Sequence, residues 1–183
     1  MKIFKTNLED CLLIEPTVHR DKRGLFYESF QKERYATIAG INHEFVQDNF
    51  SSSKKGVLRG LHFQKKKPQG KLVRVTRGRV FDVAVDIRPK SIHFKKWYSI
   101  ELSDVNNYQL WIPPGFAHGF LVLSDEADFE YKCTDFYDPQ DEGCINWKDP
   151  DLSIEWPEEE NLEISDKDFD APYLEDLTFN FES

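Results

Sequence analysis

The segment "RVFDVAVDI", residues 79–87, decides the fold class because its side chains alternate regularly along the chain. Every second position holds a large apolar residue, which predicts a β-strand with two distinct faces. The apolar series is Phe81, Val83, Val85 and Ile87, and the other face carries Val80, Asp82, Ala84 and Asp86. The segment "FAHGFLV", residues 116–122, has the same period and predicts a second strand.

Turn signals separate these strands from their neighbours. The tripeptides "RGR" (77–79), "RPK" (88–90) and "PPG" (113–115) interrupt the apolar runs. One segment, "QKERYATIAG" (31–40), has the pattern of a helix that ends at its glycine. Many short strands with closely spaced turns favour an all-β protein, an antiparallel sandwich or barrel of the jelly-roll kind with a few short helices.

Length and composition indicate one compact unit. The chain has 183 residues, 39% of them hydrophobic, so we expect a single domain over residues 1–183. The first residues lack a signal-peptide pattern and no run of about 18 apolar residues occurs, which predicts a cytoplasmic protein that does not bind membranes. The three cysteines have no C-x-x-C spacing and favour neither a disulfide framework nor a cysteine zinc site.

Charge is unevenly distributed along a chain whose formal net charge is -9. Residues 138–183 hold 16 acidic and 2 basic residues, whereas residues 54–79 hold ten Lys and Arg and no acid. The basic stretch predicts a field that attracts a small anion, although a solvated surface is the plainer interpretation. Nucleic acid is not expected, because the patch is short and no nucleic-acid-binding pattern appears.

The acidic end contains apolar residues that need burial, so we expect it to cover the barrel as an ordered segment. These residues are Ile145, Trp147, Ile154 and Trp156.

His62 lies within the basic stretch, in the strand-like run "VLRGLHFQ". In a regular strand its side chain would face away from Arg59 and Leu61. Gly60 predicts a β-bulge, which would bring Arg59 and His62 toward the same cavity. A hydrogen-bonded core histidine is the common alternative, but the nearby Arg59 and Lys71 favour a site for a negatively charged substrate.

Two further side chains are candidates for the same cavity. His118 shares the inward face of Phe116 and Phe120, and Asp82 is its candidate partner because a buried carboxylate needs a donor to offset desolvation. Tyr131 is a candidate proton donor if its hydroxyl reaches the cavity, with a core tyrosine as the alternative.

Seven segments together carry a specific resemblance. They follow one another through nearly the whole chain: "DKRGLFYESF" (21–30), "FVQDNFSSSKKGVLRGLHFQ" (45–64), "QGKLVRV" (69–75), "VFDVAVDIR" (80–88), "QLWIPPGFAHGFLVLS" (109–124), "YKCTDFYDP" (131–139) and "SDKDFDAP" (165–172). The sequence resembles the dTDP-4-dehydrorhamnose 3,5-epimerase family, nucleotide-sugar epimerases of the cupin superfamily. The resemblance implies a cupin-type antiparallel β jelly-roll barrel, a homodimer, no cofactor, and the substrate dTDP-4-dehydro-6-deoxy-D-glucose.

The resemblance also implies roles for individual residues. His62 matches the general base, Tyr131 the general acid, and Asp168 the carboxylate that orients the histidine. Lys71 matches the lysine next to the sugar ketone. Positions that bind the nucleotide or the rest of the ligand are matched by Arg23, Glu28, Gln47, Asp48, Asn49, Arg59, Lys71, His118, Glu142 and Lys167. In the family's dimers, the first two of these reach into the neighbouring subunit's site.

The implied chemistry explains these residue types. The hydrogens on C3 and C5 of a 4-keto sugar both lie alpha to one carbonyl, so a base can remove either and leave an enolate that Lys71 would stabilise. Inversion then needs a proton from the opposite face, which requires a second group, Tyr131. An imidazole suits abstraction near neutral pH, and a carboxylate on its second nitrogen fixes the tautomer. The basic stretch would hold the diphosphate and so orient the sugar.

Three alternatives stay open. An epimerase with the same acid and base could invert only C3 or only C5. Two segments depart from the family pattern: "SIHFKKW" (91–97) replaces the more usual S-x-T-F-G-x-W, and the loop "KKKPQG" (65–70) is a residue shorter than in some members, which leaves substrate preference open. A cupin sugar-binding module would bind without catalysis. A metal-dependent cupin oxygenase would explain "PPGFAH", which has the form of the second cupin metal motif, but the first motif needs H-x-H and "LHFQ" has one histidine. No metal site is therefore predicted.

Overall fold

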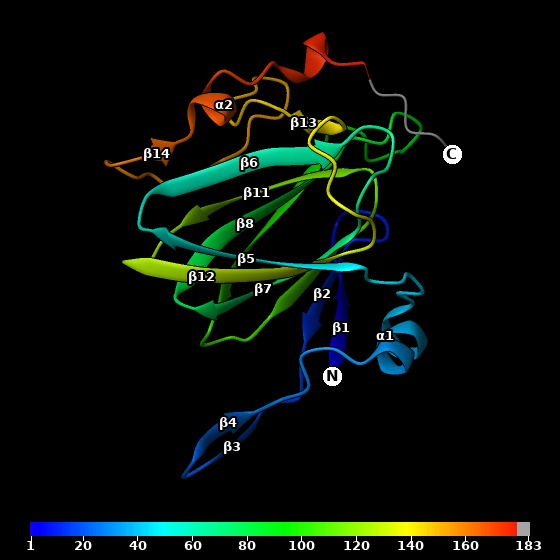
Figure 1. The fold of residues 1–183 in the computed structure, drawn as a ribbon, viewed down its shortest axis with the longest axis vertical. Coiled ribbons are helices and arrows are strands. Elements are labelled where there is room, and N and C mark those ends of the chain that lie inside the picture. The colour runs from blue at the N-terminus through cyan, green and yellow to red at the C-terminus, as the bar shows by residue number, and fades with distance from the viewer. Residues whose placement is uncertain (179–183) are drawn as a thin grey trace.

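The computed structural model describes residues 1–178 and consists almost entirely of β-strands arranged as a barrel (Figure 1). The first sheet contains β1 (Lys2–Lys5), β2 (Leu12–Glu15), β5 (Gln47–Lys54), β7 (Lys71–Arg77), β10 (Gln109–Ile112) and β12 (Glu126–Cys133). The second contains β6 (Val57–Gln64), β8 (Arg79–Asp86), β9 (Trp97–Ser103), β11 (Phe116–Val122), β13 (Glu142–Cys144) and β14 (Glu163–Ile164). The remaining elements are the hairpin β3 (His19–Asp21) and β4 (Gly24–Phe26), the helices α1 (Lys32–Ala39) and α2 (Asp166–Phe169), and the 3-10 turn η1 (Leu174–Asp176).

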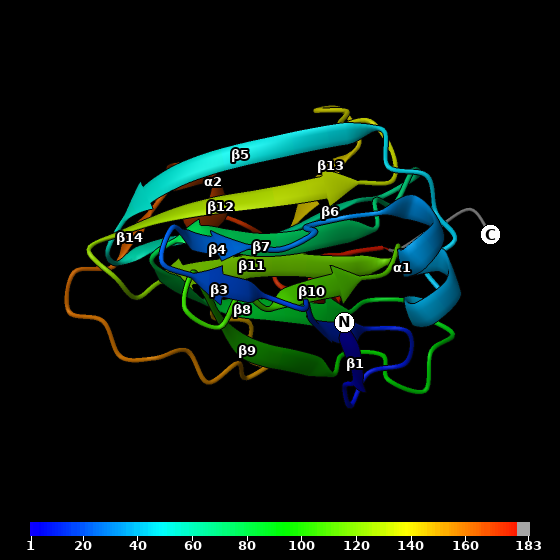
Figure 2. The same cartoon turned by 90° about the horizontal axis from the view of Figure 1, so that it is seen from below.

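The two sheets face each other and enclose the main core. The first has the strand order β1-β2-β10-β7-β12-β5. Figure 2 shows β12 and β5 side by side at the end of this order. The second has the order β13-β6-β11-β8-β9, with β14 added in parallel beside β6. All other pairings in the two sheets are antiparallel, which confirms the all-β jelly-roll barrel that the period-two pattern predicts.

Both faces of strand β8 are largely buried because two separate cores contact it. Val80 and Ala84 point into the barrel core, whereas Val83 and Val85 belong to a second core outside the barrel. The chain from β13 to η1 covers this second core; its buried residues include Ile145, Leu152 and Leu174, with Ile154 and Trp156 packed against them. The predicted ordered cover is thus confirmed up to residue 178.

The helix predicted over residues 31–40 is confirmed as α1. The Gln31 side chain caps its start by accepting a hydrogen bond from the Arg34 amide, and Gly40 ends it with a φ of 72°. Tyr35 anchors the helix to the outer face of the first sheet, where its hydroxyl lies 2.6 Å from Gln109 Oε1. Among residues 1–178, no helix has the length and apolar character needed to cross a membrane.

The bulge predicted at Gly60 is confirmed by the register of β6 against β11. His118 lies opposite His62, and Phe120 lies opposite Arg59, so β6 contains one more residue than β11 between these two pairs. Gly60 itself has a φ of 122°, and a Cβ atom there would lie 2.6 Å from the Cα of Gly119. The extra residue puts Arg59 and His62 on the same face of the strand.

Replacing Gly60 by alanine tests the close approach of β6 to β11. Gly24 is a matched control, because its φ of 126° is similar but a Cβ atom there would meet nothing within 4 Å. We expect Gly60→Ala to lower the free energy of unfolding by about 2 kcal/mol more than Gly24→Ala does, since only the first adds a clash. Urea unfolding of both variants measures the difference; equal losses would contradict the role given to this contact.

Candidate active site

A cavity of about 400 Å³ lies between the two sheets, and side chains of both sheets line it. The lining residues are Gln47, Asn49, Phe50, Ser51, Arg59, His62, Phe63, Gln64, Gln69, Lys71, His118, Gly119, Phe120, Tyr131, Tyr137 and Glu142. Most of the residues predicted from the sequence therefore meet here. The titratable groups among them come from β6, β7, β11, β12 and β13, and from the connection between β12 and β13, which carries Tyr137.

His62 is held by a carboxylate from the far end of the chain. Its Nε2 lies 2.7 Å from Oδ1 of Asp168 in helix α2, and the other oxygen of Asp168 accepts a hydrogen bond of 3.1 Å from the Gly60 amide. Burial raises the pKa of Asp168, but the hydrogen bonds with His62 and with the Gly60 amide bring it below its ordinary value. An ionised Asp168 favours the proton on Nε2, which leaves Nδ1 as the nitrogen able to accept one.

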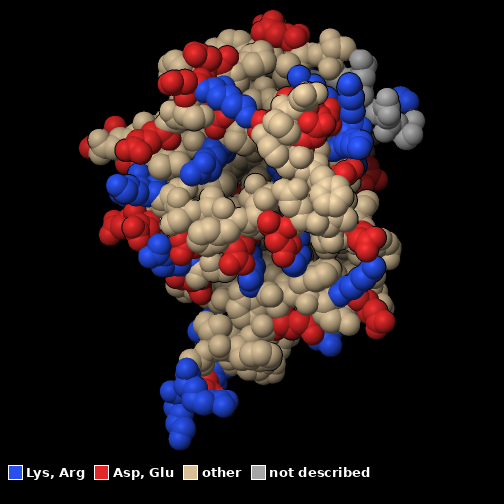
Figure 3. All heavy atoms as spheres, viewed as in Figure 1, with Lys and Arg blue, Asp and Glu red and all other residues tan. Residues whose placement is uncertain are grey.

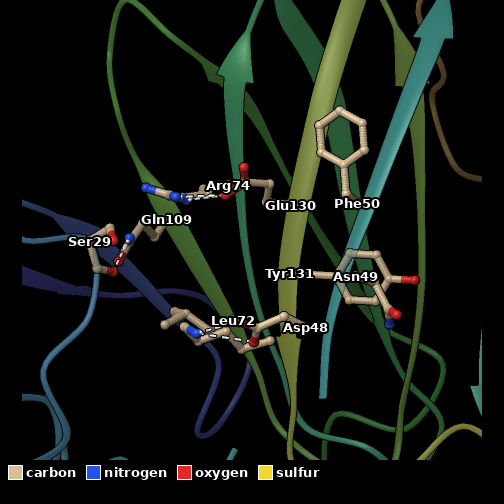
Figure 4. A pocket seen from close by; sticks show the side chains of 10 residues that line it. Ser29, Asp48, Asn49, Phe50, Leu72, Arg74, Gln109, Glu130 and Tyr131 are labelled. Atoms are coloured by element: carbon tan, nitrogen blue, oxygen red, sulfur yellow. Dashed lines mark hydrogen bonds and ion pairs between the residues drawn. The ribbon is translucent and has the colours of Figure 1, made fainter.

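Tyr131 approaches the cavity from the opposite sheet. It lies on β12, where its side chain shares the inward face of Phe129 and packs against the barrel core. Burial raises the pKa of the phenol, and a hydrogen bond with Asn49 opposes this only in part, so the hydroxyl stays protonated at neutral pH. Figure 4 shows the Tyr131 ring beside Asn49. Tyr131 is therefore placed to donate a proton rather than to accept one.

Two cations reach the cavity. Lys71 is only 9% exposed, and its Nζ lies 5.8 Å from the centroid of the Tyr131 ring. Burial lowers the pKa of Lys71, and the acidic groups of the site, including Glu142 and Asp82, act in the opposite direction. Arg59 enters from β6, where its Nε donates a hydrogen bond of 3.1 Å to Ser53 Oγ. Both positive charges face the space between the sheets.

His118 forms a second imidazole–carboxylate pair inside the barrel. Its Nε2 lies 2.9 Å from Oδ2 of Asp82, and both residues are buried. The His118 ring also stacks on Phe129, with 5.8 Å between the ring centroids. The partner that the sequence suggested for His118 is therefore confirmed, and the register of β11 with β6 puts this imidazole beside His62.

A cluster of three residues stands at the rim of the cavity. Glu142 accepts hydrogen bonds from Lys167 and, at 2.9 Å, from the Tyr137 hydroxyl. Burial raises the pKa of Glu142, but these two donors bring it below its ordinary value. Tyr137, which is 48% exposed, was not singled out from the sequence, because it lies in a turn where alternation gives no side-chain direction.

Cys144 is a second residue that the sequence reasoning missed. It lies directly opposite His62 where β13 pairs with β6, and its Sγ is 3.7 Å from Oδ1 of Asp168. Burial raises the pKa of the thiol to about 12, so it is neutral in the resting protein. Strand β13 has only three residues, too few to show a period-two pattern, so the sequence held no signal that Cys144 lies next to His62 and Asp168.

Three predicted binding residues lie outside the cavity of their own chain. Arg23 is in the β3–β4 hairpin, which projects from the barrel (Figure 1), and it pairs with Asp21. Glu28 pairs with Arg34 near the start of α1. Asp48 points to the outer face of β5 and binds Lys132 at 3.0 Å. Within one chain, the structure does not bring these side chains to His62.

Most side chains of the basic stretch do not face the cavity. Within the described part of the chain, only two of the ten Lys and Arg of residues 54–79 line the cavity, Arg59 and Lys71. Others pair with acids from distant strands; these pairs are Arg74–Glu130, Arg77–Asp128 and Arg79–Glu101. Strand alternation sends neighbouring side chains to opposite faces, and Figure 3 shows the two signs of charge interspersed on the surface.

Comparison with known proteins agrees with this geometry. Residues 5–176 match the profile of the family described as dTDP-4-dehydrorhamnose 3,5-epimerase. The dTDP-4-dehydrorhamnose 3,5-epimerase of Escherichia coli K12 is 54% identical over 169 residues, which cover 92% of this chain and 91% of the relative.

Solved structures share the fold. The crystal structure of dTDP-6-deoxy-D-glucose-3,5-epimerase from Legionella pneumophila, in complex with dTDP-4-keto-L-rhamnose, superposes with a TM-score of 0.93 at 54% identity and covers 95% of this chain and 93% of its own. A 3'-monoepimerase from Streptomyces bikiniensis in complex with dTDP-quinovose superposes with a TM-score of 0.86 at 32% identity. The match covers 93% of this chain and 86% of that protein's chain. The cupin-type jelly roll is thereby confirmed, and this chain belongs to the dTDP-4-dehydrorhamnose 3,5-epimerase family.

Proposed function

We propose that the protein inverts C3 and C5 of dTDP-4-dehydro-6-deoxy-D-glucose to give dTDP-4-dehydro-L-rhamnose, in dTDP-L-rhamnose biosynthesis. The observation that carries this proposal is one cavity with a carboxylate-paired imidazole on one sheet and a protonated phenol on the other. The Escherichia coli relative bears the name of this activity, and the Legionella relative binds dTDP-4-keto-L-rhamnose.

The proposed reaction moves protons without any net change in composition. Nδ1 of His62 takes the proton from C3, and the electron pair of the C–H bond forms the enolate of the C4 ketone. The buried ammonium of Lys71 stabilises the enolate oxygen. Tyr131 then donates its proton to the carbon from the opposite face, and exchange with water restores both groups. The same sequence at C5 completes the double inversion.

The rest of the cavity would bind the nucleotide part of the substrate. Arg59 supplies a positive charge for the diphosphate from the wall next to His62. Tyr137 offers an exposed aromatic ring at the rim, where a planar base can stack. Gln47 and Asn49 provide amide groups, and Asp82 holds His118 toward the sugar. Lys167 and Glu142 form the charged edge of the entrance.

We infer that a second copy of the chain completes the site. Arg23 and Glu28 do not line the cavity of their own chain, and the hairpin that carries Arg23 leaves Phe26 72% exposed. A hollow of about 430 Å³ on the outer face of the first sheet borders Phe50, which is 62% exposed (Figure 4). Apolar exposure of this kind favours a protein interface. A homodimer that packs this face would bring the hairpin of one copy to the cavity of the other.

Two further properties belong to the same proposal. We infer that residues 1–183 act as one domain, because β1 and β2 near the start of the chain belong to the same sheet as β7, and α2 near its end supplies the carboxylate that holds His62. The protein works in the cytoplasm, where thiols stay reduced; its three cysteines are unpaired, which suits that compartment.

Solvent-exchange kinetics in deuterium oxide test the reaction. The wild-type protein should incorporate deuterium at both C3 and C5, as followed by NMR of the sugar. His62→Asn should abolish exchange at both carbons, because no base remains. Tyr131→Phe should still exchange protons but return them from the same face, so label enters while inversion falls by about 100-fold or more.

Tyr98→Phe serves as the matched control, because Tyr98 packs against the barrel core and does not line the cavity. It should exchange and invert as the wild type does. Label at a single carbon in the wild type would identify a single-site epimerase instead. Binding of dTDP without any exchange would contradict an enzymatic function.

The buried charge of Lys71 should lower the stability of the fold. Since burial lowers its pKa, the unfolded chain holds this proton more readily than the folded one, and stability rises as pH increases from the folded pKa toward the ordinary value of about 10.4. Lys71→Met should therefore increase the free energy of unfolding at pH 7 by about 1 kcal/mol, remove that pH-dependent rise and abolish epimerisation.

Urea unfolding at neutral and alkaline pH measures the effect. Lys90→Met is the control, because this lysine is exposed and its loss should change stability by less than about 0.5 kcal/mol. A Lys71→Met variant that is clearly less stable than the wild type at pH 7 would show that the ammonium is held favourably in the fold.

A further inference from the structure

We propose that His62, Cys144 and Asp168 form a binding site for Zn²⁺ and similar thiophilic divalent cations, and that occupation of this site inhibits the protein. The three residues offer a ring nitrogen, a thiol sulfur and a carboxylate oxygen that all lie within 4.8 Å of one another. They come from β6, β13 and α2, which meet at the edge of the second sheet.

The spacing of the donor atoms suits tetrahedral coordination. Zinc bonds of about 2.0–2.3 Å place neighbouring ligand atoms about 3.3–3.8 Å apart. Cys144 Sγ and Asp168 Oδ1 already lie 3.7 Å apart. His62 Nε2 and the same oxygen lie 2.7 Å apart, so this pair must open by less than about 1 Å as the cation replaces the proton between them. The His62 side chain is 30% exposed and lines the cavity, which puts the proposed cation beside space from which water could supply the fourth ligand.

The donor set selects the class of metal. A thiolate with an imidazole favours zinc and cadmium, whereas magnesium and calcium prefer sites made of oxygen atoms alone. Among residues 1–178, the other buried thiols, Cys11 and Cys133, belong to no such cluster. The set also differs from the cupin metal pattern, because it uses a cysteine and does not include His118.

The proton balance of binding explains why the cation inhibits. The metal takes the lone pair of Nε2, so the proton of a neutral His62 moves to Nδ1, and the Cys144 thiol releases its proton to water. Nδ1 is the nitrogen proposed as the base, and once protonated it cannot remove a proton from the sugar. Asp168 is drawn to the metal at the same time. This inhibition rests on the proposed epimerase function, whereas binding of the cation does not.

Cadmium titration tests the binding claim without any activity assay. Metal-stripped protein should bind one Cd²⁺ per chain and develop the ultraviolet absorption of a cadmium–thiolate bond. Zn²⁺ should displace the cadmium, and excess Mg²⁺ should not. Cys144→Ala should lose the absorption band and weaken Zn²⁺ binding by more than about tenfold, and Cys144→Ser, which keeps the volume of the side chain, should do the same. Cys11→Ala, which removes another buried thiol, should keep the band and the affinity.

Each other outcome overturns a defined part of the proposal. Absence of the band in the wild type, or its survival in both Cys144 variants, would exclude the site. Binding that depends on Cys144 but leaves deuterium exchange of the sugar unchanged at saturating Zn²⁺ would exclude inhibition. If the wild type shows no exchange at all, the function proposed above fails, and the cadmium result still decides whether the cation site exists.

Discussion

The hydrogen bond between His62 and Asp168 connects parts of the chain 106 residues apart, and the remainder of the site is arranged around it. The same carboxylate also accepts the Gly60 amide, so one side chain fixes both the imidazole and the backbone of the bulge that aims it. Asp168 can do this only if α2 is held against β6. The second core, with Ile145, Leu152 and Leu174 buried outside the barrel, provides that attachment through apolar burial.

The barrel gives the reaction its two faces. His62 and His118 come from one sheet, and Tyr131 and Lys71 come from the other, so a sugar between the sheets has proton-transfer groups on both sides. A single sheet would present all these groups to the same face of a ligand. Burial then sets their protonation: it keeps the pKa of Tyr131 high and lowers that of Lys71. The burial that keeps the phenol protonated also makes the lysine costly to charge.

Local patterns predicted the features that depend on neighbouring residues. Alternation along residues 79–87 and 116–122 predicted strands β8 and β11, and the glycine within "VLRGLHFQ" predicted the bulge that turns His62 inward. Asp82, a carboxylate in an otherwise apolar strand, was predicted to be the partner of His118, and the two side chains are hydrogen-bonded. Each of these features depends on residues that are close in sequence or that lie on one pair of neighbouring strands.

Local sequence patterns could not predict the contacts between chain segments that are far apart in sequence. Asp168 was assigned through the family resemblance alone, because nothing in "SDKDFDAP" indicates contact with a strand 106 residues earlier. The sequence could not show which charges of the basic stretch face the cavity, because the acids that pair with Arg74 and Arg77 come from β12, more than 50 residues away. Cys144 escaped notice because only the pairing of β13 with β6 brings it to His62.

The central claim is that an imidazole and a phenol address opposite faces of one sugar ring. A crystal structure with a bound dTDP-hexose that lacks the reactive ketone measures this directly. The account predicts His62 Nδ1 and Tyr131 Oη on opposite faces of the ring, each within about 3.5 Å of C3 or C5. A ring with both groups on the same face, or a hexose bound outside the cavity between the sheets, would contradict it.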